Sequence, residues 1–429
     1  MNRLKTYQIF LLFLLFFITI VIFLPSLNAG YAETDDWVML KSYSGALKNI
    51  SFDFITNTFK HAHEGLYHPL ITLSYSCEIT IFGFVPAIFH FDNILLHLIN
   101  IFLLFLILFK LSNSFWLSFI ITSLFSIHPT RAEVVCWISS RKDLLYTFFY
   151  LLSILFYIKT YYKSKKKTYL SLSLIMFLLS CLSKSMAITL PVVLVLIDLY
   201  TNNFNKSKFK TYFLYLFFTF IFILVTFKTH YVDFSPGEFT FFNHFINFIN
   251  AHFNILFYLD KLLLPINLYC MYPLFYDMSL MPPAFILYSP AVLYLLIFFS
   301  FLSLKKAKFV FYGFIFFLVT ILPVSGIFVV GQAPVADRYT YVPYIGLFFI
   351  FAKAIIYLYN RYNKYIKILT TISCLVFFMG LNYLTYNRSI DWQKSEYGSP
   401  RKMKYYEFGI KKKSAEESKK INIIKGKRF

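Results

Sequence analysis

Charged residues are scarce in this sequence. They make up 14% of its 429 residues, and hydrophobic residues make up 59%. A soluble domain of ordinary composition is about one-quarter charged. The sequence also lacks a phosphate-binding loop, a GxSxG elbow, an HExxH pair and a dinucleotide fingerprint. These absences exclude an ordinary cytosolic enzyme and a disordered chain, and they give no support to nucleotide-driven transport.

Cysteine patterns that bind metals or build disulfide frameworks are missing too. The chain has five cysteines, far apart, with no CxxC pair and no histidine at ligand spacing. They are Cys77, Cys136, Cys181, Cys270 and Cys374. The sequence therefore predicts neither a cysteine metal site nor a disulfide scaffold.

Long apolar runs are present instead. About eleven of them are candidate membrane spans, for which roughly 20 residues are needed. We therefore expect an all-α polytopic membrane protein. Residues 240–264 are expected to form a helix lying flat at the interface, because Asn and His recur through this run. The predicted spans are 9–27, 87–110, 114–127, 143–158, 168–183, 187–200, 211–229, 284–304, 309–329, 340–358 and 366–387.

The distribution of charge predicts the orientation of these spans. With a cytoplasmic N-terminus, the short inward segments are rich in Lys and Arg, and Asp198 is the one acid near them. Most acids, up to Asp337, fall in outward segments, as the positive-inside rule requires. The net charge of +21 thus sets orientation in a lipid bilayer, and nucleic acid is not expected as a partner.

This topology divides the chain into a membrane domain and a tail. The membrane domain covers 1–387, and residues 388–429 are expected to form a flexible basic extension without repeats. Most of the unusual polar residues fall in the outward loops. These loops are 28–86, 128–142, 230–283 and 330–339.

Asp35 and Asp36 follow the first span directly. Neighbouring carboxylates can act as a general base and a metal ligand, because crowding of like charges separates their pKa values. A solvated acidic loop explains the pair equally well, and the residues alone leave both interpretations open.

The segment from His128 to Asp143 concentrates polar side chains between two apolar runs. Adjacent Arg141 and Lys142 suit a phosphate leaving group, since a guanidinium fork stands beside a point charge. An anchor of basic residues at the membrane interface is the alternative. The presence of His, Glu and Trp in the same segment favours a site. Its other candidate residues are Arg131 and Glu133.

Ionisable residues also stand at the ends of later spans. Lys184 lies between two apolar runs, and Asp337 and Arg338 stand at the head of another. Ionisable residues at such places are candidates for function. A salt bridge that fixes a loop is an equal alternative for Asp337 and Arg338. Asp198, deep in its run, is expected to be a buried hydrogen-bond partner.

The span 87–110 carries a polar stripe. His90, Asn93, His97 and Asn100 recur at helical spacing and so share one face. Such a stripe in a membrane helix usually links it to its neighbours. We favour that interpretation over a direct catalytic part for His97.

Taken in order, these segments resemble the membrane part of the transmembrane tetratricopeptide-repeat O-mannosyltransferase family and its bacterial relatives, in the GT-C glycosyltransferase superfamily. The resemblance covers most of residues 1–387. It is carried by Asp35-Asp36, YHPLITLSY at 67–75, FHFDNILLHLIN at 89–100, IHPTRAEVVCWISSRKDLL at 127–145, LSKSMAITLPVVLVLIDL at 182–199, YLDKLLLPINLYCMYP at 258–273 and GQAPVADRYTYVPYIGLF at 331–348.

The resemblance implies transfer of mannose or another hexose from a polyprenyl-phosphate donor, on the extracytoplasmic face of a bacterial inner membrane. One of Asp35 and Asp36 would be the base. The acceptor would be a protein Ser or Thr hydroxyl, or else a glycolipid or surface polysaccharide. Whether a divalent metal such as Mg²⁺ or Mn²⁺ takes part is left open. Arg141, Lys142, Lys184 and Arg338 would hold the donor phosphate, and His128, Arg131, Glu133, Asp143, Asp337 and His97 would shape the site.

The chain also departs from the family. Relatives usually continue into tetratricopeptide repeats, whereas a basic tail follows the last span here. Ser140 and Ser185 stand where relatives often carry other residues, and Asp92 stands where an apolar residue is usual. Two other classes therefore stay open: a transporter of lipid-linked sugars and a catalytically inactive membrane scaffold. A transporter or a scaffold would each keep its function after loss of Asp35 or Asp36.

Overall fold

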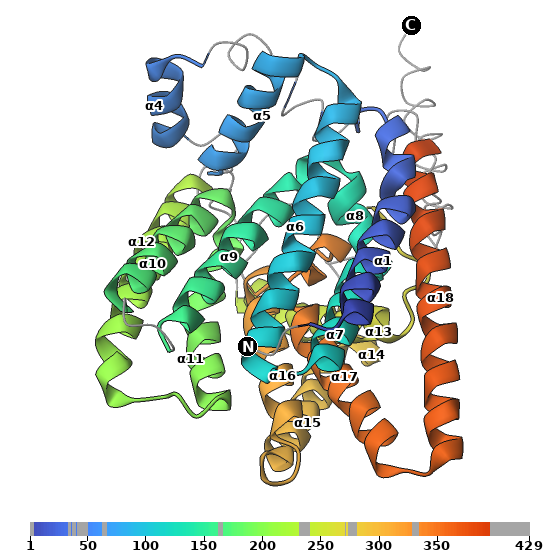
Figure 1. Cartoon of the computed structure of the whole chain (residues 1–429). Coiled ribbons are helices and arrows are strands. Elements are labelled where there is room, and N and C mark those ends of the chain that lie inside the picture. Colours follow the sequence, from blue (N-terminus) through green and yellow to red (C-terminus); the bar gives the residue numbers. More distant parts are fainter. Residues whose placement is uncertain are drawn as a thin grey trace, which may run out of the picture.

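A computed structural model of the chain contains helices and no strand among the residues that it describes (Figure 1). This confirms the all-α class. The residues described are 4–32, 36, 40, 50–61, 67–161, 166–230, 241–270, 272, 281–327 and 334–394.

The helices follow one another along the chain, with short 3₁₀ segments (η) between some of them. The first half contains α1 (Thr6–Phe23), η1 (Leu24–Asn28), α4 (Phe52–Lys60), α5 (Pro69–Phe82), α6 (Pro86–Ser112), α7 (Phe115–Ile127), α8 (Arg131–Cys136), η2 (Ile138–Ser140), α9 (Arg141–Lys159), α10 (Lys166–Ser183), η3 (Ser185–Thr189) and α11 (Leu190–Tyr200). The second half contains η4 (Lys206–Lys208), α12 (Phe209–His230), α13 (Phe241–Leu263), α14 (Ala284–Leu287), α15 (Ser289–Leu302), η5 (Ser303–Lys305), α16 (Lys308–Ile321), η6 (Leu322–Val324), η7 (Asp337–Thr340), α17 (Tyr344–Arg361) and α18 (Lys364–Lys394).

Over the residues that the structure describes, each of the eleven predicted spans falls largely on helix. Among the described residues, five helical stretches are long and apolar enough to cross a membrane, which makes the chain a polytopic membrane protein. That the other six spans also cross stays a prediction. The five stretches are Thr6–Asn28, Pro86–Ser112, Lys206–Thr226, Ala284–Lys305 and Lys364–Gln393.

The outer helices turn large apolar side chains away from the bundle. Phe13 on α1, Phe213 on α12 and Leu375 on α18 are each more than half exposed. Surface of this kind suits contact with lipid chains, whereas a soluble protein rarely exposes it over long contiguous stretches.

The centre of the bundle is formed by α6, α7, α9, α10, α16 and α17. α16 and α17 approach closely at Gly313 and Gly346, where a Cβ on Gly313 would lie 2.6 Å from the carbonyl oxygen of Gly346. Small residues permit such close packing between membrane helices.

The predicted polar stripe of α6 faces this centre, and its four residues are buried. The ring nitrogens of His97 lie 2.7 Å from the Tyr341 hydroxyl and 3.1 Å from the Ser126 carbonyl oxygen. Asn100 Nδ2 donates to the Leu144 carbonyl, 3.0 Å away. The stripe therefore links α6 to α7, to α9 and to Tyr341, which confirms its interpretation as a connection between helices.

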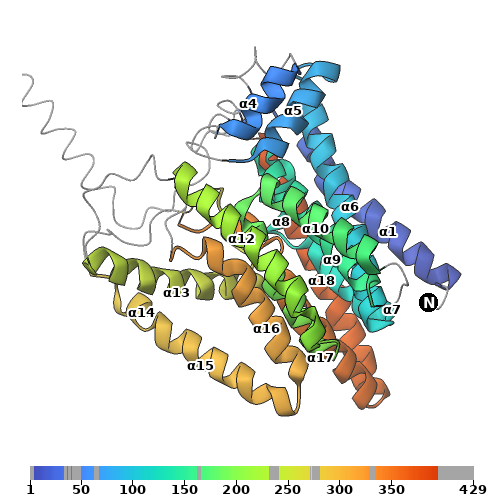
Figure 2. The same ribbon diagram turned by 90° about the vertical axis from the view of Figure 1, so that its left-hand side faces the viewer.

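The two ends of the bundle differ. The turns between α11 and α12, between α15 and α16, and between α17 and α18 lie at one end, and α4 and α5 lie at the other (Figure 1). The first set of turns carries basic residues, among them Lys208, Lys305 and Lys364. α13 is amphipathic and crosses the direction of α16 (Figure 2). A position of α13 flat in the membrane interface stays a prediction.

Candidate functional site

Asp36 is buried, and it is hydrogen-bonded to η2, which also accepts a hydrogen bond from Tyr75 of α5. Its Oδ2 accepts a hydrogen bond from the backbone N–H of Ala32 at 2.9 Å. Its Oδ1 accepts from the backbone N–H of Ser139 at 2.8 Å and from the Ser139 hydroxyl. These donors orient the carboxylate and join the segment after η1 to η2. Asp35, the other candidate base, lies outside the described residues.

The Asp36 carboxylate borders a small cavity of about 10 Å³, which has room for about one water molecule. Small residues line one part of it, including Gly30 and Cys136, and two indole rings line another part. These rings belong to Trp137 and Trp392. The lining of this cavity thus brings one carboxylate and two aromatic rings together.

Trp137 connects the cavity to basic side chains. Its ring is stacked with that of Trp392, with centroids 6.2 Å apart and planes inclined by 23°. The Arg338 guanidinium carbon lies 5.0 Å from the Trp137 ring centroid, and Lys142 Nζ lies 5.9 Å from it. Both distances are in the range of cation–π contacts. Two predicted phosphate-binding residues therefore come together at the ring beside Asp36.

A buried carboxylate holds Arg338 in place. Glu133 Oε1 accepts a hydrogen bond from Arg338 Nη1 at 2.5 Å, and Glu133 Oε2 accepts one from the Arg338 backbone N–H at 2.9 Å. Burial acts to lower the pKa of Arg338, but the charge of Glu133 outweighs it and raises this pKa above its usual value. Arg338 is therefore a fixed, permanent cation.

Lys184 is a third cation in this region. Its Nζ lies 2.5 Å from Asp143 Oδ1. Burial lowers the pKa of Lys184 to about 8; Lys142 and Arg338 add to this effect, and Asp143 opposes it. Lys184 and Arg338 lie at the same ring, because Lys184 Nζ is 5.3 Å and the Arg338 guanidinium carbon is 5.0 Å from the Tyr339 ring centroid.

The C-terminal part of α18 closes the site. Arg388 Nη2 lies 2.5 Å from Asp337 Oδ2, and the Tyr272 hydroxyl donates to Asp337 Oδ1 at 2.7 Å. Residues 388–394, which the sequence assigned to the tail, continue α18, and Trp392 is buried there. Residues 395–429 lie outside the described part of the chain.

Arg141 has other partners. Its Nη1 pairs with Glu78, its Nε donates to Asn93 Oδ1 at 3.1 Å, and its Nη2 donates to the Phe89 carbonyl at 2.9 Å. Its guanidinium carbon also lies 4.7 Å from the Tyr75 ring centroid. Each nitrogen thus already has a protein partner, and Arg141 connects α9 to α5 and α6. Its predicted contact with phosphate is untested.

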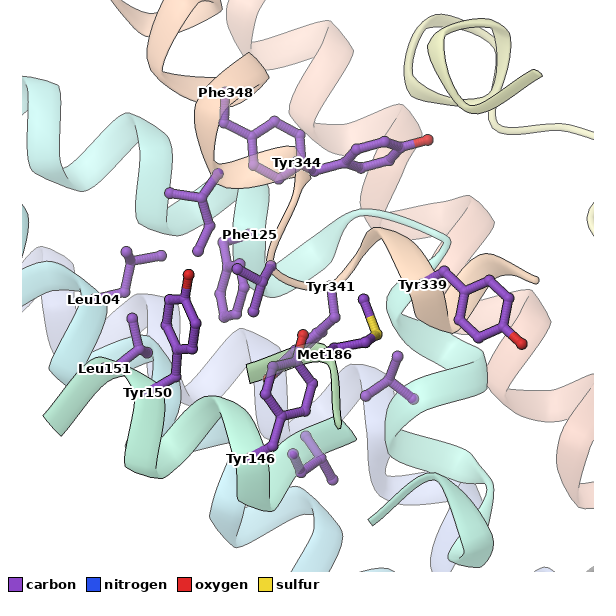
Figure 3. Packing of buried hydrophobic residues seen from close by; sticks show 14 of the residues in the cluster. Leu104, Phe125, Tyr146, Tyr150, Leu151, Met186, Tyr339, Tyr341, Tyr344 and Phe348 are labelled. Atoms are coloured by element: carbon purple, nitrogen blue, oxygen red, sulfur yellow. The ribbon is translucent and has the colours of Figure 1, made fainter. Parts of the chain in front are cut away.

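His128 and Arg131 lie among helices and aromatic rings. His128 Nδ1 is 2.9 Å from Thr130 Oγ1, and its Nε2 is 3.3 Å from the Leu262 carbonyl oxygen. The Arg131 guanidinium lies 5.1–5.8 Å from four ring centroids. Both residues are buried, and their predicted role in shaping the site stays a prediction. The four rings, labelled in Figure 3, are Phe125, Tyr341, Tyr344 and Phe348.

The described part of the chain contains no cluster of metal ligands. No group of three or more His, Cys, Asp or Glu side chains there is arranged to hold an ion. The Asp36 oxygens accept hydrogen bonds from Ala32 and Ser139. The described residues therefore do not fit a metal centre.

The sequence did not single out several residues of this site. Trp137 lay inside a candidate segment but had no assigned role, and Ser139, Trp392, Arg388 and Glu78 were not candidates. The spacing of Arg388 and Trp392, one helical turn apart directly after an apolar run, was the available signal. The hydrophilic composition of the tail concealed it.

Comparison with known proteins gives matches to one family. Over 175 residues the chain is 27% identical to the protein O-mannosyl-transferase Tmtc1 of Drosophila melanogaster, which is 39% of this chain and 20% of that protein. It is 32% identical over 149 residues to Tmtc2 of Drosophila melanogaster, with 32% of this chain and 16% of that protein covered. It is 36% identical over 104 residues to human TMTC2, covering 24% and 12%. No family model matches the chain.

These matches confirm the resemblance to protein O-mannosyl-transferases that the motifs predicted. They span a fifth or less of the length of the relatives. What the relatives' names describe is therefore carried to this chain only as a proposal.

Proposed function

We propose that this chain is a membrane glycosyltransferase of GT-C type, which moves a hexose, mannose first, from a polyprenyl-phosphate donor to a hydroxyl acceptor. The observation that carries the proposal is the cavity bordered by Asp36 and Trp137, with Arg338 and Lys142 at the Trp137 ring. It combines a carboxylate base with cations suited to a phosphate leaving group.

In the proposed reaction, Asp36 takes the proton of the acceptor hydroxyl while the hydroxyl oxygen attacks the anomeric carbon of the donor. The bond between that carbon and the phosphate oxygen breaks, and the electron pair leaves with polyprenyl phosphate. Attack from the side opposite the phosphate inverts the anomeric centre. The proton resides on Asp36 until solvent removes it.

Arg338, Lys142 and Lys184 stabilise the charge that grows on the departing phosphate. Their fixed positions support this role, because cations held in advance need no reorganisation during the reaction. Asp143 and Glu133 maintain these positions through ion pairs with Lys184 and Arg338. The phosphate would share these cations with the carboxylates.

The proposed orientation places Asp36 on the extracytoplasmic side of a bacterial inner membrane, with the N-terminus in the cytoplasm. The basic turns at the end opposite α4 and α5 support it through the positive-inside rule. A donor with its sugar exposed on that side would reach Asp36 from the outer leaflet. Protein Ser or Thr hydroxyls are the first acceptors to test, and glycolipid or polysaccharide hydroxyls are the second.

The test uses the full chain in lipid nanodiscs with radiolabelled polyprenyl-phosphate mannose, other polyprenyl-phosphate hexoses, and Ser/Thr peptide or glycolipid acceptors. Asp36→Asn should reduce turnover about 100- to 10,000-fold, the range expected for loss of a general base. Asp53→Asn, which changes an exposed acid on α4, is the matched control and should retain turnover.

Turnover by the wild-type protein that depends on Asp36 supports the proposal, and the acceptor that gains label identifies the product. Equal turnover in wild type and Asp36→Asn would contradict the assignment of the base. Absence of cleavage with every donor would favour a lipid-linked sugar transporter or an inactive scaffold.

A further inference from the structure

The segment that carries Arg338 is held by side chains of other elements. η7 is a 3₁₀ segment of four residues, and a segment this short has few backbone hydrogen bonds of its own. From α8, Glu133 accepts a hydrogen bond from the Arg338 backbone N–H at 2.9 Å, and Arg131 Nη2 donates to the Thr340 carbonyl at 3.3 Å. The position of Arg338 therefore depends on contacts from outside η7.

Arg388 of α18 supplies a further contact of this kind. It pairs with Asp337, the first residue of η7, through Nη2 and Oδ2, which lie 2.5 Å apart. The Asp337 side chain is 1% exposed, and that of Arg388 is 10% exposed. A buried carboxylate is costly when no cation compensates its charge. The Tyr272 hydroxyl donates to the same carboxylate but carries no positive charge, so Arg388 provides this compensation.

Loss of Arg388 would alter the surroundings of Arg338. Asp337 directly precedes Arg338, whose guanidinium is paired with Glu133 and lies 5.0 Å from the Trp137 ring centroid. An uncompensated Asp337 would compete with Glu133 for this guanidinium. It would also oppose the approach of a phosphate, because like charges repel. Arg388 thus keeps Arg338 in place and available to an anion.

The charge balance of the region leads to the same conclusion. Ion pairs and shared aromatic rings connect four cations to three carboxylates, so the positive charges exceed the negative charges by one. Without Arg388 the numbers are equal, and the attraction for a phosphate is weaker. The cations are Lys142, Lys184, Arg338 and Arg388, and the carboxylates are Glu133, Asp143 and Asp337.

We infer that Arg388 is a positioning residue for donor binding: its ion pair with Asp337 fixes Arg338 where the donor phosphate is held. The inference rests on the proposed function. Arg388 acts through Arg338 and contacts no reacting atom. The last turns of α18, which follow the apolar part of that helix, thereby become part of the site.

The experiment uses the full chain in nanodiscs and measures binding of polyprenyl phosphate and turnover of radiolabelled polyprenyl-phosphate mannose. Arg388→Gln removes the charge, and Arg388→Lys keeps it. The control is Arg361→Gln, because Arg361 is exposed at the end of α17 and lies 5.3 Å from the Tyr357 ring centroid. The folded fraction of each variant is measured alongside.

Arg388→Gln should weaken binding and lower turnover, each by up to about 100-fold, as expected when a binding group is displaced. Arg388→Lys should restore part of both losses, and Arg361→Gln should change neither. Wild-type affinity and turnover in folded Arg388→Gln would overturn the inference.

A double-variant cycle separates positioning from a general effect on folding. Because Arg388 acts through Arg338, adding Arg388→Gln to Arg338→Ala should weaken binding by about twofold or less. If the two losses multiply instead, Arg388 acts independently of Arg338 and the inference is wrong.

A second double variant covers the case in which Arg388→Gln alone does not fold. Adding Asp337→Asn removes the uncompensated carboxylate, so folding and most of the affinity for polyprenyl phosphate should return. A folded double variant without this recovery would contradict the inference. If the wild-type chain neither binds polyprenyl phosphate nor cleaves any mannosyl donor, the proposed function itself fails, which is distinct from failure of the Arg388 assignment.

Discussion

Two buried aspartates lie toward opposite ends of the helix bundle, and their partners differ. Asp198 on α11 accepts hydrogen bonds from the hydroxyls of Tyr157 at 2.6 Å, Tyr161 and Tyr212, and from Lys208 Nζ at 2.8 Å. Asp36 accepts from backbone N–H groups and one serine hydroxyl, and it borders a cavity.

The comparison teaches that burial of a carboxylate does not by itself indicate catalysis. Two donors reach each oxygen of Asp198, which fills the usual acceptor capacity of a carboxylate. These donors come from α9, η4, α12 and the turn after α9, so Asp198 fastens several elements together. This confirms its prediction as a buried hydrogen-bond partner. Asp36 instead combines a fixed orientation with a position at the edge of a small cavity.

The largest difference between the two clusters should appear when a cation is removed. Arg338→Ala leaves Glu133 buried without its partner and removes a cation from the phosphate site, so turnover should fall about 100- to 1,000-fold. Lys208→Ala removes the cation of the Asp198 cluster and should leave turnover per folded molecule unchanged. Donor turnover is measured for both variants. An equal loss of turnover in the two would contradict the different roles assigned to the Asp36 and Asp198 clusters.

Asp198→Asn should lower the stability of the folded protein. Replacing this carboxylate disrupts four hydrogen bonds, and we expect the free energy of unfolding to fall by about 1–3 kcal/mol. Denaturant unfolding in detergent micelles measures the change, with turnover recorded on the folded fraction. A loss of turnover in fully folded Asp198→Asn protein would show that this end of the bundle also serves the reaction.

The affinity for the donor should depend on pH at one end of the molecule. Because the pKa of Lys184 is about 8, its charge is present below pH 8 and is lost as pH rises through 8. Affinity for polyprenyl phosphate should therefore fall above pH 8, by up to about tenfold per pH unit. Lys184→Arg, whose side chain keeps its charge, should remove this fall.

Glu78 requires a separate check in this experiment. Burial raises its pKa to about 8, Arg141 opposes that rise, and Asp92 adds to it, so Glu78 ionises in the same range. A fall in affinity that persists in Lys184→Arg would assign the pH dependence to Glu78. A fall that disappears assigns it to Lys184.

The smallest expected effects come from deleting one hydroxyl beside each carboxylate. Ser139→Ala removes one donor to Asp36 but keeps the backbone N–H, and turnover should fall about 3- to 10-fold. Tyr212→Phe removes one donor to Asp198 and should lower the free energy of unfolding by about 0.5–1.5 kcal/mol without a change in turnover. If Tyr212→Phe lowered turnover and Ser139→Ala lowered only the free energy of unfolding, the roles assigned to the Asp36 and Asp198 clusters would be reversed.

Hydrophobic patterning was sufficient to locate the helices. Each of the eleven predicted spans falls largely on helix where the structure describes it, and the run at 240–264 forms α13. Apolar length is a local property, so it can be read along the chain. α18 continues past the predicted end of its span, where Arg388 pairs with Asp337 and Trp392 stacks on Trp137, both far away in the sequence.

The candidate site was predicted in part. The structure brings Lys142 and Arg338 to the Trp137 ring, and Lys184 lies with Arg338 at the Tyr339 ring. It also gives Arg141 a full set of protein partners, headed by Glu78. Sequence order could not show which carboxylate pairs with which cation, because these pairs depend on how helices pack side by side.

The most direct test of the account compares Asp36→Asn with Asp198→Asn in a single-turnover assay of donor cleavage, with donor binding measured in parallel. The account predicts that Asp36→Asn binds polyprenyl-phosphate mannose normally but cleaves it at least 100-fold more slowly, while folded Asp198→Asn cleaves it at the wild-type rate. Equal rates for both variants, or a larger loss in Asp198→Asn, would contradict the assignment of the reaction to the Asp36 cavity.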